Sequence, residues 1–452
     1  MIVARMFWLW LALLCTTTSV AATANGVPVF QAERFRSETF QSEIYTVHLG
    51  QRSKPMVLLI HGLGQAGWTD WQQVMPALSE HYFVLTFDLP GFGKSAASNV
   101  MYSPEQYARL CEEIRQRFAP GKKIQVIGHS LGGAVALQYA AQYARQIEKL
   151  VLVDVAGIVH RSVFMQHVMK ASLRPDNALL GGVYQWLEPG LSRFGAGLTR
   201  RLEQLPDFSR FLLENPLARE QLLHERSNLQ AALALIETNF IDTFSKADMP
   251  TLIVWGEHDP VTALRTGKLL KQKMPNASLQ TLSGAGHVPM KSHFDAFITT
   301  IKPFLLQPPT PTQQASSANP LPLVRCHKQR GFFFSGKATR IELESCPDAR
   351  LEHVETTALQ IMNSEAEVFD VRIRGAQTAV VLQRSRLTLT AADISAPLGF
   401  QAEDSVLDVA GLELHGATAL WQGSGSNGFF SVSRRWRGDG SSETLHDVFR
   451  LR

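Results

Sequence analysis

A Gly-x-Ser-x-Gly pattern at Gly128, Ser130 and Gly132 constrains the fold of this chain more than any other feature. Residues 124–127 before it are mostly β-branched and apolar, and residues 134–144 after it form an alanine-rich helical pattern. This context predicts a strand that turns sharply into a helix, with Ser130 at the apex. Glycine is needed on both sides because side chains there would clash where strand and helix nearly touch. Ser130 would lie at a helix N-terminus, where N–H groups stabilise a developing oxyanion, so it is a candidate nucleophile.

The length and charge of the chain limit its class. The 452 residues are more than one compact core usually takes, so two domains are expected. With 45% hydrophobic and 19% charged residues, the composition is that of an ordinary folded protein. A net charge of +4 is mild for this length, and no basic aromatic patch stands out, so no nucleic-acid partner is expected.

Residues 1–24 have the pattern of an export signal. Arg5 is followed by an apolar run over residues 6–14, and Ala-Thr-Ala directly before Asn25 fits a cleavage site. The run is too short for a comfortable membrane span, so export to the periplasm or outside the cell is expected. An uncleaved signal that anchors the chain in the membrane is the alternative.

The cysteines fit an exported protein. Cleavage would leave Cys111, Cys326 and Cys346, and an oxidising compartment favours a disulfide between Cys326 and Cys346. Such a loop closure is worth about 3 kcal/mol. Cys111 falls on a predicted amphipathic helix over residues 104–118, where a small buried residue is expected. No clustered Cys/His spacing indicates a metal site.

Strands and helices alternate between residues 44 and 155, which predicts a parallel sheet with crossover helices. Residues 157–246 show amphipathic helical patterns and no convincing strand, and the alternation resumes over residues 251–306. We therefore expect one α/β domain over residues 25–306, with a helical insertion at 157–246. A proline-rich polar linker follows at residues 307–322.

The remaining segment, residues 323–452, has a different pattern. Strand-period alternation dominates, and residues 368–373, 389–394 and 409–414 resemble one another at steps of 21 and 20 residues. A repeat of short strands at this spacing predicts the coils of a parallel β-helix. The alternative is an antiparallel β-sandwich whose strand spacing is coincidental.

A serine nucleophile needs a base and a carboxylate that orients it. His287 follows the last predicted strand, in a loop of small residues, and is preferred over His258 and His293 as the base. Asp259 and Asp154 both follow strand ends at the same edge of a parallel sheet. Asp259 lies in a sharper loop and is preferred, with Asp154 as the alternative acid.

The oxyanion hole requires two backbone N–H groups. Leu131, which follows the nucleophile, would supply one, and Leu63, in a loop after an adjacent strand, would supply the other. Loss of one such donor typically costs about 2.7–4 kcal/mol of barrier.

Residues 44–306 together resemble the α/β-hydrolase superfamily, in its capped, esterase-like branch. The resemblance rests on the His61-Gly62 loop, the Asp88 to Ser95 turn, the Gly128 to Gly132 elbow, the Asp259 loop and His287. It implies an eight-stranded, mostly parallel sheet, a catalytic triad at the carboxyl ends of the strands, and a lid built from the insertion. Serine at the elbow argues against the dehalogenase and epoxide-hydrolase branches, which use aspartate there.

These observations predict an exported serine hydrolase, a carboxylesterase that forms an acyl-enzyme and needs no cofactor. Many apolar side chains in the insertion favour an apolar acyl group in a small-molecule ester. Lipase action, carbon–carbon bond hydrolysis and cofactor-free peroxidation remain open on the same scaffold. A rival of another class is a non-catalytic surface protein whose C-terminal domain contacts a glycan or the cell surface. The pattern predicts no oligomeric state.

Overall fold

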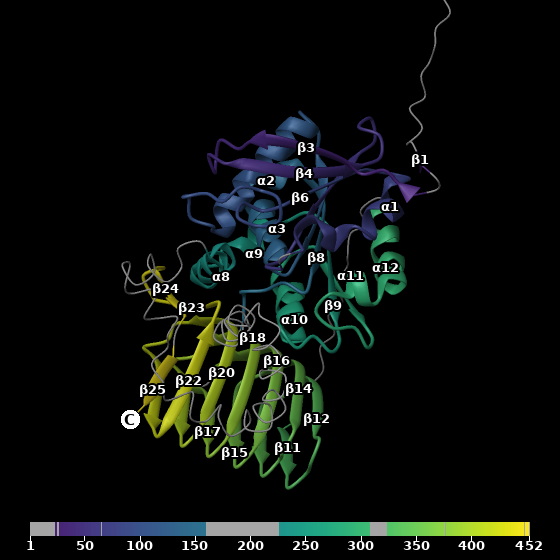
Figure 1. Ribbon diagram of the computed structural model, residues 1–452. Helices are drawn as coiled ribbons and strands as arrows, with labels where there is room; N and C mark the ends of the chain where they lie inside the picture. Colours follow the sequence, from purple (N-terminus) through teal and green to yellow (C-terminus); the bar gives the residue numbers. More distant parts are fainter. Residues whose placement is uncertain are drawn as a thin grey trace, which may run out of the picture.

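The computed structural model describes residues 23–24, 27–64, 66–159, 226–307, 323–375, 377–446 and 448–451. Figure 1 shows an N-terminal α/β domain and, below it, an all-β C-terminal domain made of broad sheets. The predicted fold class is therefore present in both parts. Within the described residues, no helix is both long and apolar enough to cross a membrane.

The N-terminal domain is built on one eight-stranded sheet. Its strand order is β10-β9-β8-β7-β5-β6-β4-β3, and only the pairs β3–β4 and β4–β6 are antiparallel. The strands are β3 (Gln31–Arg36), β4 (Glu43–Leu49), β5 (Met56–Ile60), β6 (Phe83–Phe87), β7 (Ile124–His129), β8 (Ile147–Val153), β9 (Thr251–Gly256) and β10 (Ala277–Leu282). A separate pair, β1 (Thr23–Ala24) and β2 (Val27–Pro28), precedes the sheet.

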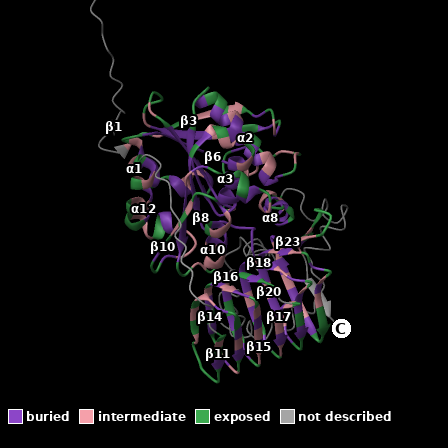
Figure 2. Cartoon of the chain, turned by 180° about the vertical axis from the view of Figure 1, so that it is seen from behind, coloured by how far each residue is buried: buried purple, intermediate pink, exposed green. Residues whose placement is uncertain are grey.

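Helices cover both faces of this sheet, so its central strands are buried throughout (Figure 2). On β5, Met56, Leu58 and Ile60 join one hydrophobic cluster, whereas Val57 and Leu59 join another. The first cluster includes α2 (Pro104–Phe118), α3 (Leu131–Gln142), α8 (Ser227–Glu237), α9 (Thr243–Lys246) and α10 (Leu264–Lys273). The second includes η1 (Gly67–Trp71), α1 (Val74–Ser79), α11 (Pro289–Ser292) and α12 (Phe294–Leu306), and a short turn, η2 (Ala144–Gln146), leads into β8.

Strand β3 is an element that the sequence pattern did not indicate. It pairs only with β4 at the edge of the sheet, and its side chains are exposed or half-buried. Since a strand with no buried face needs no apolar alternation, its sequence carries little signal.

Of the predicted insertion at 157–246, residues 160–225 lie outside the described residues, and α8 and α9 account for most of the rest.

The C-terminal domain winds its strands alternately into two sheets, which enclose a separate hydrophobic core. One sheet contains β11 (Leu323–His327), β13 (Arg340–Glu344), β15 (Ala358–Met362), β17 (Thr378–Gln383), β19 (Leu398–Glu403) and β21 (Ala419–Ser424), all parallel. The other contains β12 (Phe333–Lys337), β14 (Ala349–Thr356), β16 (Glu365–Arg374), β18 (Arg386–Ser395), β20 (Val406–His415), β22 (Ser426–Ser431), β23 (Ser433–Trp436), β24 (Ser442–Leu445) and β25 (Val448–Leu451). Within the second sheet, β22–β25 and β23–β24 are antiparallel.

The sequence repeat corresponds to stacked strands in this second sheet. Val368 pairs with Leu389 and Leu389 with Val409, so the three repeats lie in register on β16, β18 and β20. Apolar side chains of successive coils therefore stack on one another inside the domain. The parallel pairing excludes the antiparallel sandwich for these strands.

A ladder of buried serines shapes one corner of each coil. The hydroxyl of each serine accepts a backbone N–H from the preceding coil at 2.9–3.1 Å and donates to the carbonyl two residues before it. The residue before each serine has a positive φ, which turns the chain from one sheet to the other. The serines are Ser364, Ser385, Ser405 and Ser426.

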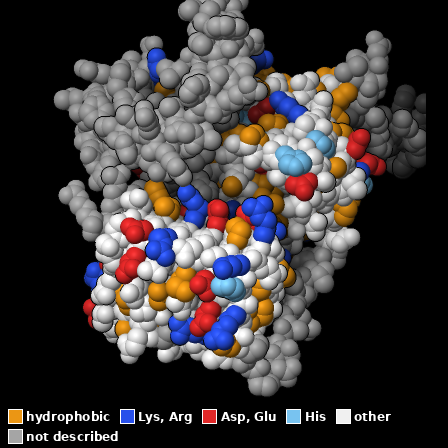
Figure 3. All heavy atoms as spheres, turned by 90° about the horizontal axis from the view of Figure 1, so that it is seen from below, with side chains coloured by type: hydrophobic (Ala, Val, Ile, Leu, Met, Phe, Trp, Pro, Cys, Tyr) orange, Lys and Arg blue, Asp and Glu red, His pale blue; other side chains and the backbone are white. Residues whose placement is uncertain are grey.

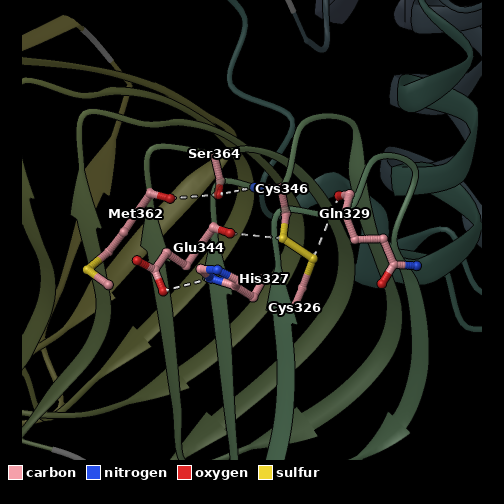
Figure 4. Close-up of a disulfide and its surroundings, with 7 residues drawn as sticks. All are labelled: Cys326, His327, Gln329, Glu344, Cys346, Met362 and Ser364. Atoms are coloured by element: carbon pink, nitrogen blue, oxygen red, sulfur yellow. Dashed lines mark hydrogen bonds and ion pairs between the residues drawn. A yellow bond between two sulfur atoms is a disulfide. The ribbon is translucent and has the colours of Figure 1, made fainter.

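The predicted disulfide is present. Cys326 of β11 is bonded to Cys346, which follows β13, and both residues are buried (Figure 4). The bond links the first strand of one sheet to the turn after the next strand, and His327 and Glu344 pair beside it at 3.1 Å. It therefore ties the first coil of the domain to the second.

Candidate active site

The turn at Ser130 has the geometry expected from its glycines. Ser130 has φ 54° and ψ −117° and directly precedes α3. A Cβ atom on Gly128 would lie 2.2 Å from the carbonyl oxygen of Gly132, and one on Gly132 would lie 2.2 Å from the carbonyl oxygen of Ile60. Backbone cannot give way at such distances, so only glycine fits at either position. Leu131 begins the helix immediately after the serine.

Ser130, His287 and Asp259 come together at the carboxyl ends of their strands. Nε2 of His287 lies 3.0 Å from Oγ of Ser130, so the hydroxyl can donate to the ring. On the other side of the ring, Nδ1 of His287 donates to Oδ2 of Asp259 at 2.7 Å. The serine is 4% exposed and the aspartate side chain is fully buried, whereas the histidine side chain retains 16% exposure.

Asp259 is held as a carboxylate by several donors. The N–H groups of Val261 and Thr262 donate to its Oδ1 at 2.7 and 3.0 Å, and the Thr262 hydroxyl donates to its Oδ2 at 2.5 Å. Burial by itself would raise the pKa of Asp259, but the hydrogen bond and charge of His287 and the bonds from Thr262 lower it below its usual value. The lowered pKa favours a negatively charged carboxylate at Asp259, next to Nδ1 of His287.

Asp154, the alternative acid, occupies a different place. Its Oδ1 accepts the N–H of Gly256 at 2.8 Å, and its Oδ2 is buried with no donor among the described residues. Burial, followed by the neighbouring charge of Asp259, raises the pKa of Asp154 well above its usual value. The raised pKa favours the protonated form of Asp154, and Asp259 is the carboxyl group bonded to His287.

The loops that carry Asp259 and His287 are joined to each other by hydrogen bonds, one between backbone groups and one to the carboxylate of Glu257. The N–H of His258 donates to the carbonyl of Ala285 at 2.8 Å, and Glu257 accepts from the N–H of Gly284 at 3.1 Å. A Cβ on Gly256 would lie 2.2 Å from the carbonyl oxygen of Gly286. The acid and the base therefore lie on two loops that form one unit, which sets their separation.

The loop at Leu63 lies against the nucleophile. A Cβ on Gly62 would lie 3.1 Å from the Cβ of Ser130, so the chain passes close to the serine here. The buried ring of His61 fixes this loop, because its Nδ1 donates to the carbonyl of Gly62 at 2.7 Å and its Nε2 accepts the N–H of Leu89 at 2.9 Å. Burial lowers the pKa of His61, which keeps the ring neutral for both bonds.

His129 is a site residue that the sequence reasoning did not single out. Its Nε2 donates to the backbone carbonyl of His287 at 2.6 Å, so the residue before the nucleophile holds the loop of the base. Burial, and then the nearby His287, lowers the pKa of His129 to about 3. Its only sequence signal is its place inside the Gly-x-Ser-x-Gly pattern, which by itself indicates no role for the side chain.

The Asp88 to Ser95 turn is held together by hydrogen bonds of its own aspartate and serine. The carboxylate of Asp88 accepts the N–H groups of Trp68 and Lys94 at 2.6 and 2.7 Å. The Ser95 hydroxyl donates to the Asp88 carbonyl at 2.6 Å. This turn thus ties η1 to the end of β6, close to the Leu63 loop.

The described residues bear on two further expectations, the absence of a metal site and the apolar side chains of the lid. Within the described ranges, no group of three or more His, Cys, Asp or Glu residues is placed to hold a metal ion. The apolar lid side chains on which the acyl preference rests fall within residues 160–225, outside the described residues.

Comparison with known proteins identifies the family. The family model described as alpha/beta hydrolase fold matches residues 55–294, which include Leu63, Ser130, Asp259 and His287. The chain belongs to this family. It is a hydrolase of the esterase-like kind, since relatives named as esterases and lipases are among its matches.

Three of these relatives indicate the extent of the similarity. A pimeloyl-[acyl-carrier protein] methyl ester esterase of Aeromonas hydrophila is 28% identical over 254 residues, which is 56% of this chain and 95% of that protein. Lipase 3 of Moraxella sp. is 25% identical over 290 residues, covering 61% of this chain and 88% of the relative. A crystal structure of a putative lipase from Acinetobacter baumannii has 27% identity and a TM-score of 0.44 over 61% of this chain and 91% of its own.

Proposed function

We propose that this protein is an exported serine hydrolase that cleaves carboxylic esters with Ser130, His287 and Asp259. The observation that carries the proposal is the unbroken pair of hydrogen bonds, 3.0 Å from serine to histidine and 2.7 Å from histidine to aspartate. This arrangement allows a histidine to activate a serine while a buried carboxylate stabilises the resulting imidazolium.

The reaction follows from these positions. Oγ of Ser130 attacks the ester carbonyl carbon while its proton passes to Nε2 of His287. The tetrahedral intermediate collapses, the carbon–oxygen bond to the alcohol breaks, and His287 returns the proton to the departing alcohol oxygen. Water then attacks the acyl-enzyme with His287 as base again, which releases the acid and restores Ser130.

Leu63 and Leu131 are the proposed oxyanion donors. Leu131 N–H is the first of helix α3, and the Leu63 loop lies against Ser130. Both roles belong to the backbone, so the side chains at these positions can vary without loss of the donor.

An ester with an apolar acyl group is the proposed substrate class. The relatives named a methyl ester esterase and a lipase support ester chemistry. Lipase action, carbon–carbon bond hydrolysis and cofactor-free peroxidation are the competing reactions. One relative is named a 2-hydroxy-6-oxo-6-(2'-aminophenyl)hexa-2,4-dienoic acid hydrolase. The competing reactions would use the same serine, histidine and aspartate, so a substrate panel must separate them.

The deciding experiment measures hydrolysis of chromogenic esters of increasing acyl length by the chain from Asn25 onward. Ser130→Ala and His287→Asn should both lose nearly all activity. His258→Asn is the matched control, since its exposed ring lies on the neighbouring loop and should leave kcat unchanged. Activity that survives in Ser130→Ala, or that disappears in His258→Asn, would contradict the assignment.

Export is the second part of the proposal. The buried disulfide between Cys326 and Cys346 supports it, because disulfides persist in oxidising compartments. Mass spectrometry of the chain isolated from periplasm and medium should find Asn25 as the first residue. A chain that keeps Met1 in the membrane fraction would indicate an uncleaved anchor instead.

We also propose that the C-terminal domain is a short parallel β-helix, which the alternation of its strands between two sheets supports. Contact between this domain and a glycan or the cell surface is a competing role. The face drawn in Figure 3 mixes Lys and Arg with Asp and Glu side chains, which does not favour a partner of one charge. Pull-down of cell-wall glycans with full-length Ser130→Ala tests this role.

A further inference from the structure

The C-terminal domain receives helix α10 of the hydrolase domain on its larger sheet. Figure 1 shows α10 next to β18, and α10 contacts β18 and β20 on one side and β9 and β10 on the other. Small residues make room for the helix, since Ala391 and Ala410 join the hydrophobic core of the hydrolase domain together with Leu269. A Cβ on Gly411 would lie 2.4 Å from Cδ1 of Leu269, so the helix sits directly on the sheet backbone.

Arg265, in the first turn of α10, is the most enclosed polar anchor of this contact. Its side chain is 9% exposed, and its guanidinium pairs with Oδ2 of Asp408 at 2.8 Å. It also donates to the carbonyl oxygens of Leu389 and Asp408 at 2.7 and 3.1 Å, and to the hydroxyl of Thr390. Because a planar guanidinium with several fixed acceptors has one satisfied orientation, this anchor fixes where α10 begins.

Weaker polar contacts continue along the helix. Gln272 donates to Asp370 of β16 at 2.9 Å, while Lys268 and Lys273 lie 3.8 and 3.9 Å from Glu352 of β14 and Glu413 of β20. Helix α10 thus contacts four neighbouring strands of the C-terminal sheet, and its positive side chains face negative side chains on those strands. Such complementarity selects one register of docking.

Helix α10 is directly connected to the loop that carries the triad acid. Thr262, three residues before Arg265, donates its N–H and its hydroxyl to Asp259. The carbonyl of Thr262 accepts from the indole N–H of Trp255 on β9 at 3.0 Å. The chain from Asp259 to Arg265 therefore runs between a point fixed by the hydrolase sheet and a point fixed by the C-terminal domain.

We propose that the C-terminal domain positions the active site: it binds α10, with Arg265 as the positioning residue, and so holds the Asp259 carboxylate on His287. The inference rests on the proposed serine mechanism. The C-terminal sheet then has an intramolecular role, since the segment that it binds is helix α10 of the same chain. Undocking of α10 would then reduce catalysis without altering any residue that touches substrate.

The test compares Gly411→Leu with Gly416→Leu in the full chain. Both glycines have positive φ, 70° and 67°, so both substitutions carry the same backbone cost, but nothing lies within 4 Å of a Cβ at Gly416. Gly411→Leu should lose roughly tenfold to a hundredfold in kcat with KM little changed, because a small displacement of a catalytic group is costly. Gly416→Leu should retain wild-type kcat.

A second readout needs no substrate. The proton between Nδ1 of His287 and Asp259 should give a far-downfield proton NMR resonance, identified by its absence in Asp259→Asn. Gly411→Leu and Arg265→Ala should weaken or shift this resonance, and Arg265→Lys, which keeps the charge but not the planar fork, should give an intermediate effect. Near-UV circular dichroism identifies any variant that has not folded. If Gly411→Leu and Arg265→Ala fail to fold, the resonance of Arg265→Lys decides the test.

The two proposals can fail separately. If the wild type hydrolyses no ester but Gly411→Leu changes the resonance, the proposed function fails and the positioning role stands. If esters are hydrolysed and both Gly411→Leu and Arg265→Ala keep the resonance and kcat, losing only thermal stability, the contact is merely structural and this inference is overturned.

Discussion

Nε2 of His129 donates to the backbone carbonyl oxygen of His287 at 2.6 Å, so the residue before the nucleophile holds the loop that carries the base. The two rings also lie close, with centroids 5.0 Å apart. The distance between serine and histidine is therefore set in part by a side chain that has no proton-transfer role in the proposed mechanism.

Replacement of His129 by leucine should lower kcat/KM. The change removes the donor and leaves a buried carbonyl unpaired, which typically costs about 1–3 kcal/mol, or roughly 5- to 150-fold if it acts on the transition state. Steady-state kinetics with a chromogenic ester measure the loss, with His258→Asn as the control. An unchanged kcat/KM would show that the loop holds His287 without this bond.

His129 should also make the protein sensitive to acid. Its pKa is about 3 in the folded chain, below the ordinary value of 6.5, so the unfolded chain binds the extra proton between these values. Its contribution to stability is complete above pH 6.5 and falls by about 1.4 kcal/mol per pH unit below it. Urea unfolding at pH 7.5 and 5.0 should show a smaller pH-dependent loss for His129→Gln than for the wild type; equal losses would contradict the neutral ring.

Asp154 should be protonated at neutral pH. Because its pKa is raised in the folded chain, the folded state binds more protons above the ordinary value of 3.8, and stability is lost as pH rises from there toward the raised pKa. Asp154→Asn should therefore raise the free energy of unfolding at pH 8 and leave kcat little changed. Infrared difference spectra should show a protonated carboxyl band that this variant lacks; a variant less stable at pH 8 would indicate a carboxylate.

Loss of the disulfide should destabilise the C-terminal domain. The bond joins Cys326 and Cys346, which are 20 residues apart in sequence, and closure of a loop of this size is worth about 3 kcal/mol. Reductant should lower the thermal midpoint of the wild type but not that of the Cys326→Ser/Cys346→Ser double variant.

Cys111 is free and fully buried, so it should not react with thiol reagents until the chain unfolds.

Gly128→Ala should disrupt the turn at the nucleophile. Its Cβ would lie 2.2 Å from the carbonyl oxygen of Gly132, so strand β7 and helix α3 would have to separate, at a cost of about 1–3 kcal/mol or more. Gly438→Ala is the control, since nothing lies within 4 Å of a Cβ there. Thermal unfolding and ester turnover of both variants, compared with the wild type, test the expectation.

Much of the fold could be predicted because its signals are local. The buried runs of β5 and β7, the helix over residues 104–118 and the repeat on β16, β18 and β20 are each visible within a short window. Strand β3 could not be found in this way because it is an exposed edge strand. The sharper loop at Asp259 favours it over Asp154, but only the folded geometry shows which carboxyl group is bonded to His287.

The sequence by itself determined the features that depend on residues close together in the chain. These are the glycines around Ser130, the small residues around His287, and the coils that repeat every 20 or 21 residues. Only the tertiary structure decided which residues far apart in the sequence bind and position one another. The bond from His129 to His287 spans 158 residues, and the bond from Arg265 to Asp408 spans 143. Such contacts leave no local period in the sequence, because their partners meet only after each segment has folded and packed.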